Sequence, residues 1–172
     1  MSSSAIRAAA AGDTVAFARI VAAYHADMVR VAYVVAGGRQ DLADDAVQAA
    51  WTIAWQKLRS LRDPERLKPW LVSVAANEAR QVCRRQRRLA FVELDVTKDD
   101  PVAGDPADRT GALDLERAIG HLSADDRALL ALRYEAGLDS SEIGALARRP
   151  AATIRWRLAR LLARLRKELT DA

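Results

Sequence analysis

Apolar residues recur every three or four positions along most of this chain, and that spacing predicts helices. The first clear stripe follows Asp13, which suits a helix N-cap, and stops at Gly37-Gly38, which suits a helix end. The stripe consists of Phe17, Ile20, Val21, Tyr24, Met28, Val31 and Val35. No run alternates apolar and polar residues convincingly, so we expect an all-α fold.

Two more helices are predicted in the N-terminal half. One follows Asp41 and is broken by Asp63-Pro64, and the next runs from about Leu67 to Arg88. Tryptophans at helical spacing are more typical of a core than of a binding site. We therefore expect at least one of Trp51 and Trp55 to be buried.

The third predicted helix has two different faces. Leu67, Leu71, Val74 and Val82 make an apolar stripe, whereas Ser73, Asn77, Arg80, Arg84 and Arg87 or Arg88 make a polar one. Five arginines and no acid lie between residues 80 and 88. The polar stripe predicts a nucleic-acid contact, in which Asn77 hydrogen-bonds a base edge or an unstacked base. The alternative is a purely solvated helix end.

Residues 92–112 interrupt the helical pattern. Between Glu93 and Arg109 the sequence holds six acids, two bases, two prolines and one glycine, with no apolar period. That composition is typical of a flexible linker. We expect two small helical domains, at 1–91 and 113–172, joined by this acidic linker.

The C-terminal part predicts four helices. A short one covers about 113–121, and Ser123 with Asp126 resembles a capping box that opens a helix over 127–136, closed by Gly137. Asp139 or Ser140 then caps the first helix of a helix-turn-helix, and Pro150 suits the first turn of the second. The buried stripe expected for that last helix is Ile154, Leu158, Leu161 or Leu162, Leu165 and Leu169.

The opposite face of the last helix is basic. Trp156 lies about 200° around the axis from Ile154, so we expect it to face outward with Thr153 and Arg160. Residues 148–168 contain eight bases against one acid. The candidate contacts to duplex DNA are Arg149, Thr153, Arg155, Trp156, Arg157 and Arg160. The alternative for the exposed Trp is packing against a partner protein.

Composition narrows the function further. The 172 residues carry a net charge of +4, which suits a polyanionic partner. The single cysteine, Cys83, excludes an internal disulfide, and with only His25 and His121 beside it we expect no metal and no cofactor. No apolar run is long enough to span a membrane and no leader is recognisable, so we expect a soluble cytoplasmic protein.

No catalytic site is recognisable in the sequence. It has no nucleophile motif and no phosphate-binding loop, and the Asp44-Asp45 carboxylates would diverge by about 100° on a helix. A charged binding face explains that pair better than a metal site. We therefore expect a protein that is not an enzyme.

The chain resembles the extracytoplasmic-function sigma factors of bacterial RNA polymerase, which belong to the sigma-70 family. The resemblance lies in the order of its parts: two helical domains joined by an acidic linker, with a basic third helix in the first and a terminal helix-turn-helix in the second. The resemblance covers nearly the whole chain. The segment Ala43–Trp55 is similar to the region 2.2 of that family. By that similarity the residues that dock on core RNA polymerase are Asp44, Asp45, Gln48 and Trp51.

Two further segments carry the resemblance. Residues 69–88 are similar to the promoter-melting and minus-ten segment, which implies that Asn77 and Arg80 contact the minus-ten element. Residues 122–138 are similar to the opening of region 4, whose recognition helix would meet the minus-thirty-five element. The implied partners are core RNA polymerase, promoter DNA and an anti-sigma factor. The chain departs from the usual pattern at Ala49, Arg148 and Trp156.

A stand-alone helix-turn-helix regulator that does not bind polymerase is the alternative. In that protein the N-terminal helices would form a dimerisation or sensor domain. Joint exposure of Asp44, Gln48 and Trp51 would favour the sigma factor, whereas a homodimer seam of Trp51 and Trp55 would favour the regulator.

Overall fold

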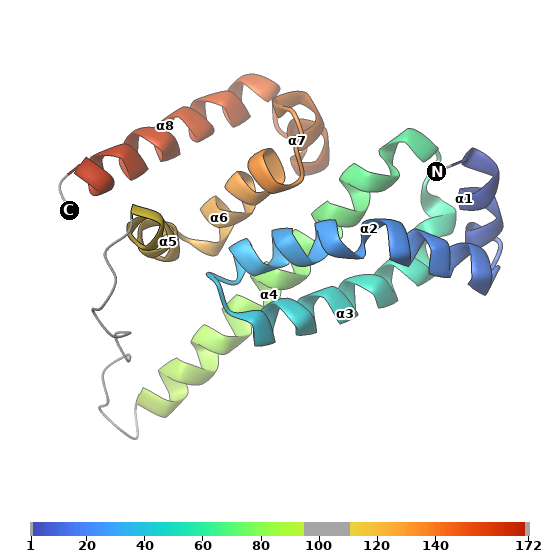
Figure 1. The fold of residues 1–172 in the computed structure, drawn as a ribbon, viewed down its shortest axis with the longest axis horizontal. Helices are drawn as coiled ribbons and strands as arrows, with labels where there is room; N and C mark the ends of the chain where they lie inside the picture. Colours follow the sequence, from blue (N-terminus) through green and yellow to red (C-terminus); the bar gives the residue numbers. More distant parts are fainter. Residues whose placement is uncertain (1, 95–110, 171–172) are drawn as a thin grey trace.

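A computed structural model describes residues 2–94 and 111–170, and every regular element within these ranges is helical (Figure 1). The α-helices are α1 (Ser3–Ala10), α2 (Thr14–Val35), α3 (Gln40–Lys57), α4 (Leu67–Leu94), α5 (Gly111–Gly120), α6 (Ala124–Leu130), α7 (Ser140–Ala147) and α8 (Ala151–Thr170). Short 3-10 turns η1 (Leu58–Ser60) and η2 (Pro64–Arg66) join α3 to α4, and the π-helical turn η3 (Ala131–Glu135) continues α6. The all-α prediction is confirmed, while most of the predicted linker, 95–110, lies outside the described residues.

The ends of α2 follow the predicted signals. The Asp13 carboxylate caps the helix by accepting from the backbone N–H of Val15 (2.9 Å) and of Ala16 (3.0 Å). After the helix, Gly37 and Gly38 adopt φ angles of 71° and 83°, a region that favours glycine. The apolar pattern gave no prediction for α1, which packs its apolar side against α2.

Helix α3 begins without a capping side chain. Its N-cap residue, Arg39, instead hydrogen-bonds the Asp41 carboxylate, with Arg39 Nη2 2.7 Å from Asp41 Oδ2. That hydrogen bond holds the pKa of the Asp41 carboxyl below its usual value. An acid in the first helical turn is also favourable for the helix dipole.

The three long N-terminal helices share one apolar core. Ile20, Met28 and Val31 of α2 are fully buried, as are Leu71 and Val72 of α4. Figure 1 shows α2, α3 and α4 running alongside one another, with α4 reaching well beyond the other two. Helix α4 runs to Leu94 and is thus longer than the helix predicted to end near Arg88. No described helix is long and apolar enough to cross a lipid bilayer.

The C-terminal helices pack on the side of α2 and α4 (Figure 1). Ser123 caps α6 by accepting from the Asp126 N–H (3.1 Å), so this helix begins three residues earlier than predicted. Gly137 has a φ of 73° and ends the α6–η3 segment, as expected. Asp139 and Glu142 then form a capping box at the start of α7.

The apolar stripe of α8 is buried except at its end. Ile154, Leu158, Leu161 and Leu165 are buried, whereas Leu169 is 39% exposed. The prediction for Leu169 was wrong because, at 100° per residue, it has drifted about 60° around the axis from Ile154 and lies in the last helical turn. The helix no longer directs that position toward α5 and α7.

The turn between α7 and α8 is tight. Arg148 adopts a left-handed conformation with φ 52°, and the N–H of Arg149 donates to the carbonyl of Gly144 (2.9 Å). A Cβ at Gly144 would lie 2.6 Å from the Arg149 carbonyl oxygen, so only glycine fits there. Pro150 directly precedes α8, and its carbonyl accepts from the N–H of Thr153 (3.0 Å).

The left-handed conformation of Arg148 predicts an unusual order of stability. Arg148→Gly and Arg148→Ala remove the same charge, but only glycine relieves the backbone, so the Gly variant should unfold with a free energy about 1 kcal/mol higher than the Ala variant. At Arg149, whose φ is not positive, Ala should instead exceed Gly by about 0.4–1 kcal/mol. Urea denaturation followed by circular dichroism measures all four values. The same order at both positions would contradict the assignment.

Candidate nucleic-acid interface

The polar face predicted on α4 lies on the surface of the protein. Asn77, Arg84, Arg87 and Arg88 are exposed, and Ser73 and Arg80 are partly exposed. The Ser73 hydroxyl donates to the Trp70 carbonyl of its own helix (2.7 Å), so its proton is already used. The Asn77 amide N–H groups and the exposed guanidinium groups of Arg84, Arg87 and Arg88 are the donors that this face presents to a ligand.

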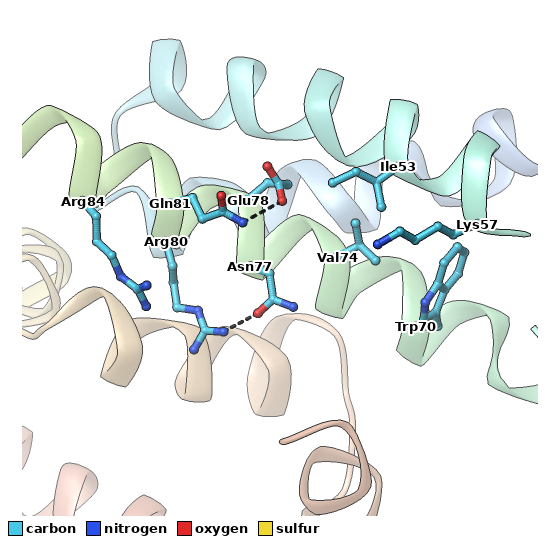
Figure 2. A pocket seen from close by; sticks show the side chains of 9 residues that line it. All are labelled: Ile53, Lys57, Trp70, Val74, Asn77, Glu78, Arg80, Gln81 and Arg84. Atoms are coloured by element: carbon cyan, nitrogen blue, oxygen red, sulfur yellow. Dashed lines mark hydrogen bonds between the residues drawn. The ribbon is translucent and has the colours of Figure 1, made fainter. Parts of the chain in front are cut away.

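A cavity of about 310 Å³ opens between α3 and α4, beside this face (Figure 2). Its residues are Ile53, Lys57, Trp70, Val74, Asn77, Glu78, Arg80, Gln81 and Arg84. One end holds the apolar and aromatic side chains together with the amine of Lys57, and the other holds two amides, the Glu78 carboxylate and two guanidinium groups. That combination suits a flat polar ring linked to an anion, such as a nucleotide.

Glu78 is a buried member of the cavity wall that the sequence did not single out. Its side chain accepts a hydrogen bond from Gln81 Nε2 (3.0 Å), drawn as a dashed line in Figure 2. The residue is only 8% exposed. A single acid among alanines on an amphipathic helix gives no signal of burial.

Arg80 already has partners within the chain. Its guanidinium donates to Asn77 Oδ1 and, through Nη1, to Asp125 Oδ1 at the start of α6 (3.0 Å). Arg84 Nη2 lies 3.6 Å from the same Asp125 oxygen. Among the described residues, Nε of Arg80 has no hydrogen-bond acceptor although it is buried.

A second basic face lies on α8. Trp156 is 58% exposed, as predicted, and the Arg160 guanidinium carbon lies 4.9 Å from the centroid of its ring. Thr153 and Arg155 are exposed on the same helix, as is Arg149 in the preceding turn. Arg157 is also exposed, but one of its guanidinium nitrogens, Nη2, already donates a hydrogen bond to Asp126 Oδ1 (3.1 Å).

The acidic face predicted on α3 is also at the surface. Asp44, Asp45 and Gln48 are exposed, and Gln40 Nε2 donates to Asp44 Oδ1 (2.7 Å). Trp51 is half-buried, with its indole N–H donating to His25 Nδ1 (3.2 Å). The four residues thus share one helix and an accessible surface.

The expectation that Trp51 or Trp55 is buried was wrong. Trp55 is 43% exposed and Trp51 is half-buried. Both rings lie edge-on to Phe17, with centroid distances of 4.9 Å for Trp55 and 5.8 Å for Trp51. Because Phe17 is itself only half-buried at the surface of α2, it cannot cover either indole completely.

Sequence reasoning also missed Arg127, which is 5% exposed. Its Nε donates to the Val35 carbonyl at the end of α2 (2.8 Å), and its Nη1 donates to the carbonyls of Leu122 (2.7 Å) and Gly120 (3.2 Å). An arginine that follows two aspartates is typical of a solvated helix start. Nothing local in the sequence indicates its burial.

Comparison with known proteins identifies the N-terminal helices. Residues 20–89, which cover α3, most of α2 and most of α4, match the family described as Sigma-70 region 2. Both the acidic face of α3 and the arginine face of α4 lie within that match.

Two relatives extend the similarity along the chain. The probable RNA polymerase sigma factor RfaY of Xanthomonas campestris is 31% identical over 171 residues, which cover 94% of this chain. The chain spans only 42% of the length of RfaY. The ECF RNA polymerase sigma factor SigW of Bacillus subtilis is 27% identical over 173 residues, covering 93% of this chain and 92% of SigW.

Two solved structures have the same fold. The sigma factor RpoE of Bartonella quintana, solved with the anti-sigma factor NepR, has a TM-score of 0.70 and 24% identity, covering 90% of this chain and 96% of RpoE. CnrH, solved with the cytosolic domain of CnrY, has a TM-score of 0.68 and 24% identity, covering 97% of this chain and 96% of CnrH.

The aromatic contacts around Phe17 predict how the α3 face is held in place. Phe17→Ala removes the ring against which both tryptophans pack, so the free energy of unfolding should fall by about 2 kcal/mol. The tryptophan emission should shift to longer wavelengths because the indoles become more hydrated. Phe17→Leu keeps most of the volume and should cost less than about 1.5 kcal/mol. Equal losses for the two variants would exclude a specific role for the ring.

Proposed function

The chain belongs to the sigma-70 family, in its extracytoplasmic-function group, and we propose that it binds core RNA polymerase and directs it to promoters. The observation that carries this proposal is the match to region 2 across the same helices that expose an acidic face on α3 and an arginine face on α4. The chain acts through binding, as a specificity subunit, and the polymerase supplies the chemistry. As a polymerase subunit it works in the cytoplasm.

The α3 face is the proposed contact with core polymerase. Asp44, Asp45 and Gln48 project from one side of the helix, and Trp51 continues that side with a half-buried indole. Exposed acids beside a partly hydrated aromatic ring form a surface on which a basic helical partner can dock. The exposure of Asp44 and Gln48, with Trp51 partly exposed on the same helix, favours a sigma factor over a stand-alone regulator.

The α4 face is the proposed contact with the separated strand at the minus-ten element. The cavity beside it offers the Trp70 ring to a base, the Asn77 amide to a base edge, and Arg80 and Arg84 to phosphates. Ser73 supports this face from its own helix, and Arg87 and Arg88 extend it toward the helix end.

Helices α7 and α8 are the proposed helix-turn-helix that binds the minus-thirty-five element. The exposed face of α8 presents Thr153, Arg155 and Trp156, while the tight turn at Gly144 and Arg148 sets the angle between the helices. Trp156 supplies an apolar surface and Arg160, stacked on its ring, supplies charge. Arg149 and Arg157 flank this surface.

We also propose two domains, at 1–91 and 113–172, joined by the acidic linker at 92–112. The composition of the linker supports this division, and α4 and α5 end and begin near its limits, at Leu94 and Gly111. Such a linker permits the two DNA contacts to lie far apart on a promoter.

An anti-sigma factor is the third proposed partner. The relatives RpoE and CnrH were solved in complexes, with NepR and the cytosolic domain of CnrY respectively. In this chain a cavity of about 500 Å³ lies between the end of α2 and the C-terminal helices, lined among others by Tyr33, Val34 and Ile119. It offers a partner segment a seat in which apolar side chains alternate with the charged groups of Arg30, Glu116 and Glu135.

The polymerase contact predicts a loss of affinity from a surface change. Asp45→Ala combined with Gln48→Ala should weaken binding to purified bacterial core RNA polymerase by about tenfold, because it removes one charge and one amide from the docking face. Fluorescence anisotropy with a labelled chain measures the affinity. Glu65→Ala, an exposed acid on η2, is the control and should leave binding unchanged. Binding to duplex DNA but not to core polymerase would point to the stand-alone regulator.

The α4 face predicts two separable effects on promoter binding by the holoenzyme. Arg84→Ala should weaken all promoters alike and reduce the slope of log affinity against log salt by about 0.7–0.9, as expected for one lost phosphate contact. Asn77→Ala should leave that slope unchanged and reduce discrimination between minus-ten sequences. Titrations of promoter variants at several salt concentrations measure both effects. The assignment fails if Asn77→Ala changes only the salt slope.

A further inference from the structure

The first turn of α6 contacts both proposed DNA-binding faces at once. Its three consecutive charged residues, Asp125, Asp126 and Arg127, each reach a different part of the protein. Asp125 pairs with Arg80 and Arg84 of α4, and Asp126 pairs with Arg157 of α8. We call these three residues the clasp.

Arg127 anchors the clasp to the N-terminal helices. It is 5% exposed, and its guanidinium donates to the last turn of α2 through the Val35 carbonyl (2.8 Å). A cation is favourable at this position because helix carbonyls carry the negative end of the dipole. Gly37 lies directly beside it, since a Cβ there would be in ordinary van der Waals contact with Arg127 Cζ, at 3.4 Å. Because these bonds are buried, salt screens them little.

The aspartates occupy the groups that phosphate would use. Arg80 Nη1 lies 3.0 Å from Asp125 Oδ1, and Arg157 Nη2 lies 3.1 Å from Asp126 Oδ1, distances at which guanidinium also binds a phosphate oxygen. The side chains of Arg84 and Asp125 are 59% and 54% exposed, so these surface pairs are weak and open to competition. The buried Nε of Arg80 lacks an acceptor within the described residues and would gain one from a better-placed ligand.

We propose that the clasp holds the free chain in a closed state in which Asp125 and Asp126 take the place of DNA phosphates, so that α6 must leave α2 and α4 before promoter DNA can bind. This inference rests on the proposed function, because it assigns a regulatory contact to the same arginines. The buried hydrogen bonds of Arg127 contribute most of the stability of the closed state. The two aspartates compete with DNA phosphates for the arginines.

The test compares three variants of the full chain without polymerase. Asp125→Asn should raise the affinity for a short fluorescent single-stranded DNA by about two- to fivefold, the factor that one surface ion pair is worth. Asp114→Asn removes the same charge from a pair within α5 and is the matched control for net charge. Arg127→Met should raise the affinity by about tenfold or more and increase the radius of gyration in small-angle X-ray scattering.

Two results would overturn the clasp. One is an affinity gain for Asp125→Asn no larger than that for Asp114→Asn, and the other is an unchanged radius of gyration for Arg127→Met with its helical circular dichroism intact. If Arg127→Met loses its helical circular dichroism, the proposal is tested by the DNA affinity of Asp125→Asn relative to that of Asp114→Asn alone. Failure of the proposed function is a separate result: wild type and variants would all fail to bind core polymerase, whereas the scattering would still report whether the chain opens.

Discussion

The arrangement of the described helices depends on a buried guanidinium at the end of a helix. Arg127 has no carboxylate partner among the described residues, and it satisfies its charge with carbonyl oxygens of Val35, Gly120 and Leu122. Removing a cation from water is costly unless its donors are used. The end of α2 can provide the acceptor because its last carbonyls have no partner within the helix. The same bond fixes where α6 lies relative to α4.

This anchor decides which charges meet at the surface. With α6 held against α2 and α4, the carboxylates that precede Arg127 fall beside arginines from two separate basic faces. Without these carboxylates, the repulsion between neighbouring arginines would have little to offset it. The acids of α6 therefore reduce repulsion in the free chain, and they can be displaced because the pairs are solvent-exposed. The positive faces become available to a polyanion once α6 and its carboxylates have moved away from them.

Local features of the fold followed from the sequence, and features that depend on distant partners did not. The Asp13 cap, the glycines at 37 and 137 and the outward direction of Trp156 each depend on residues within one helical turn. The burial of Arg127 depends on Val35, which lies 92 positions away. The partial exposure of Trp51 and Trp55 likewise depends on how far Phe17 of another helix covers them. Hydrophobic periodicity predicts which face of a helix turns toward the core. It does not predict how completely the side chains of another helix cover that face.

The turn before α8 illustrates why a departure from a family pattern need not change a fold. Arg148 is one of the positions where the chain departs from that pattern, and its left-handed backbone is a conformation that favours glycine. Arg148 adopts that backbone with φ 52° and remains exposed, and Gly144 absorbs the close approach of the following carbonyl. The strain is local and small, of the order of 1 kcal/mol. In return the turn carries one more exposed cation, next to Arg149. The geometry of the turn is thus kept while its charge changes.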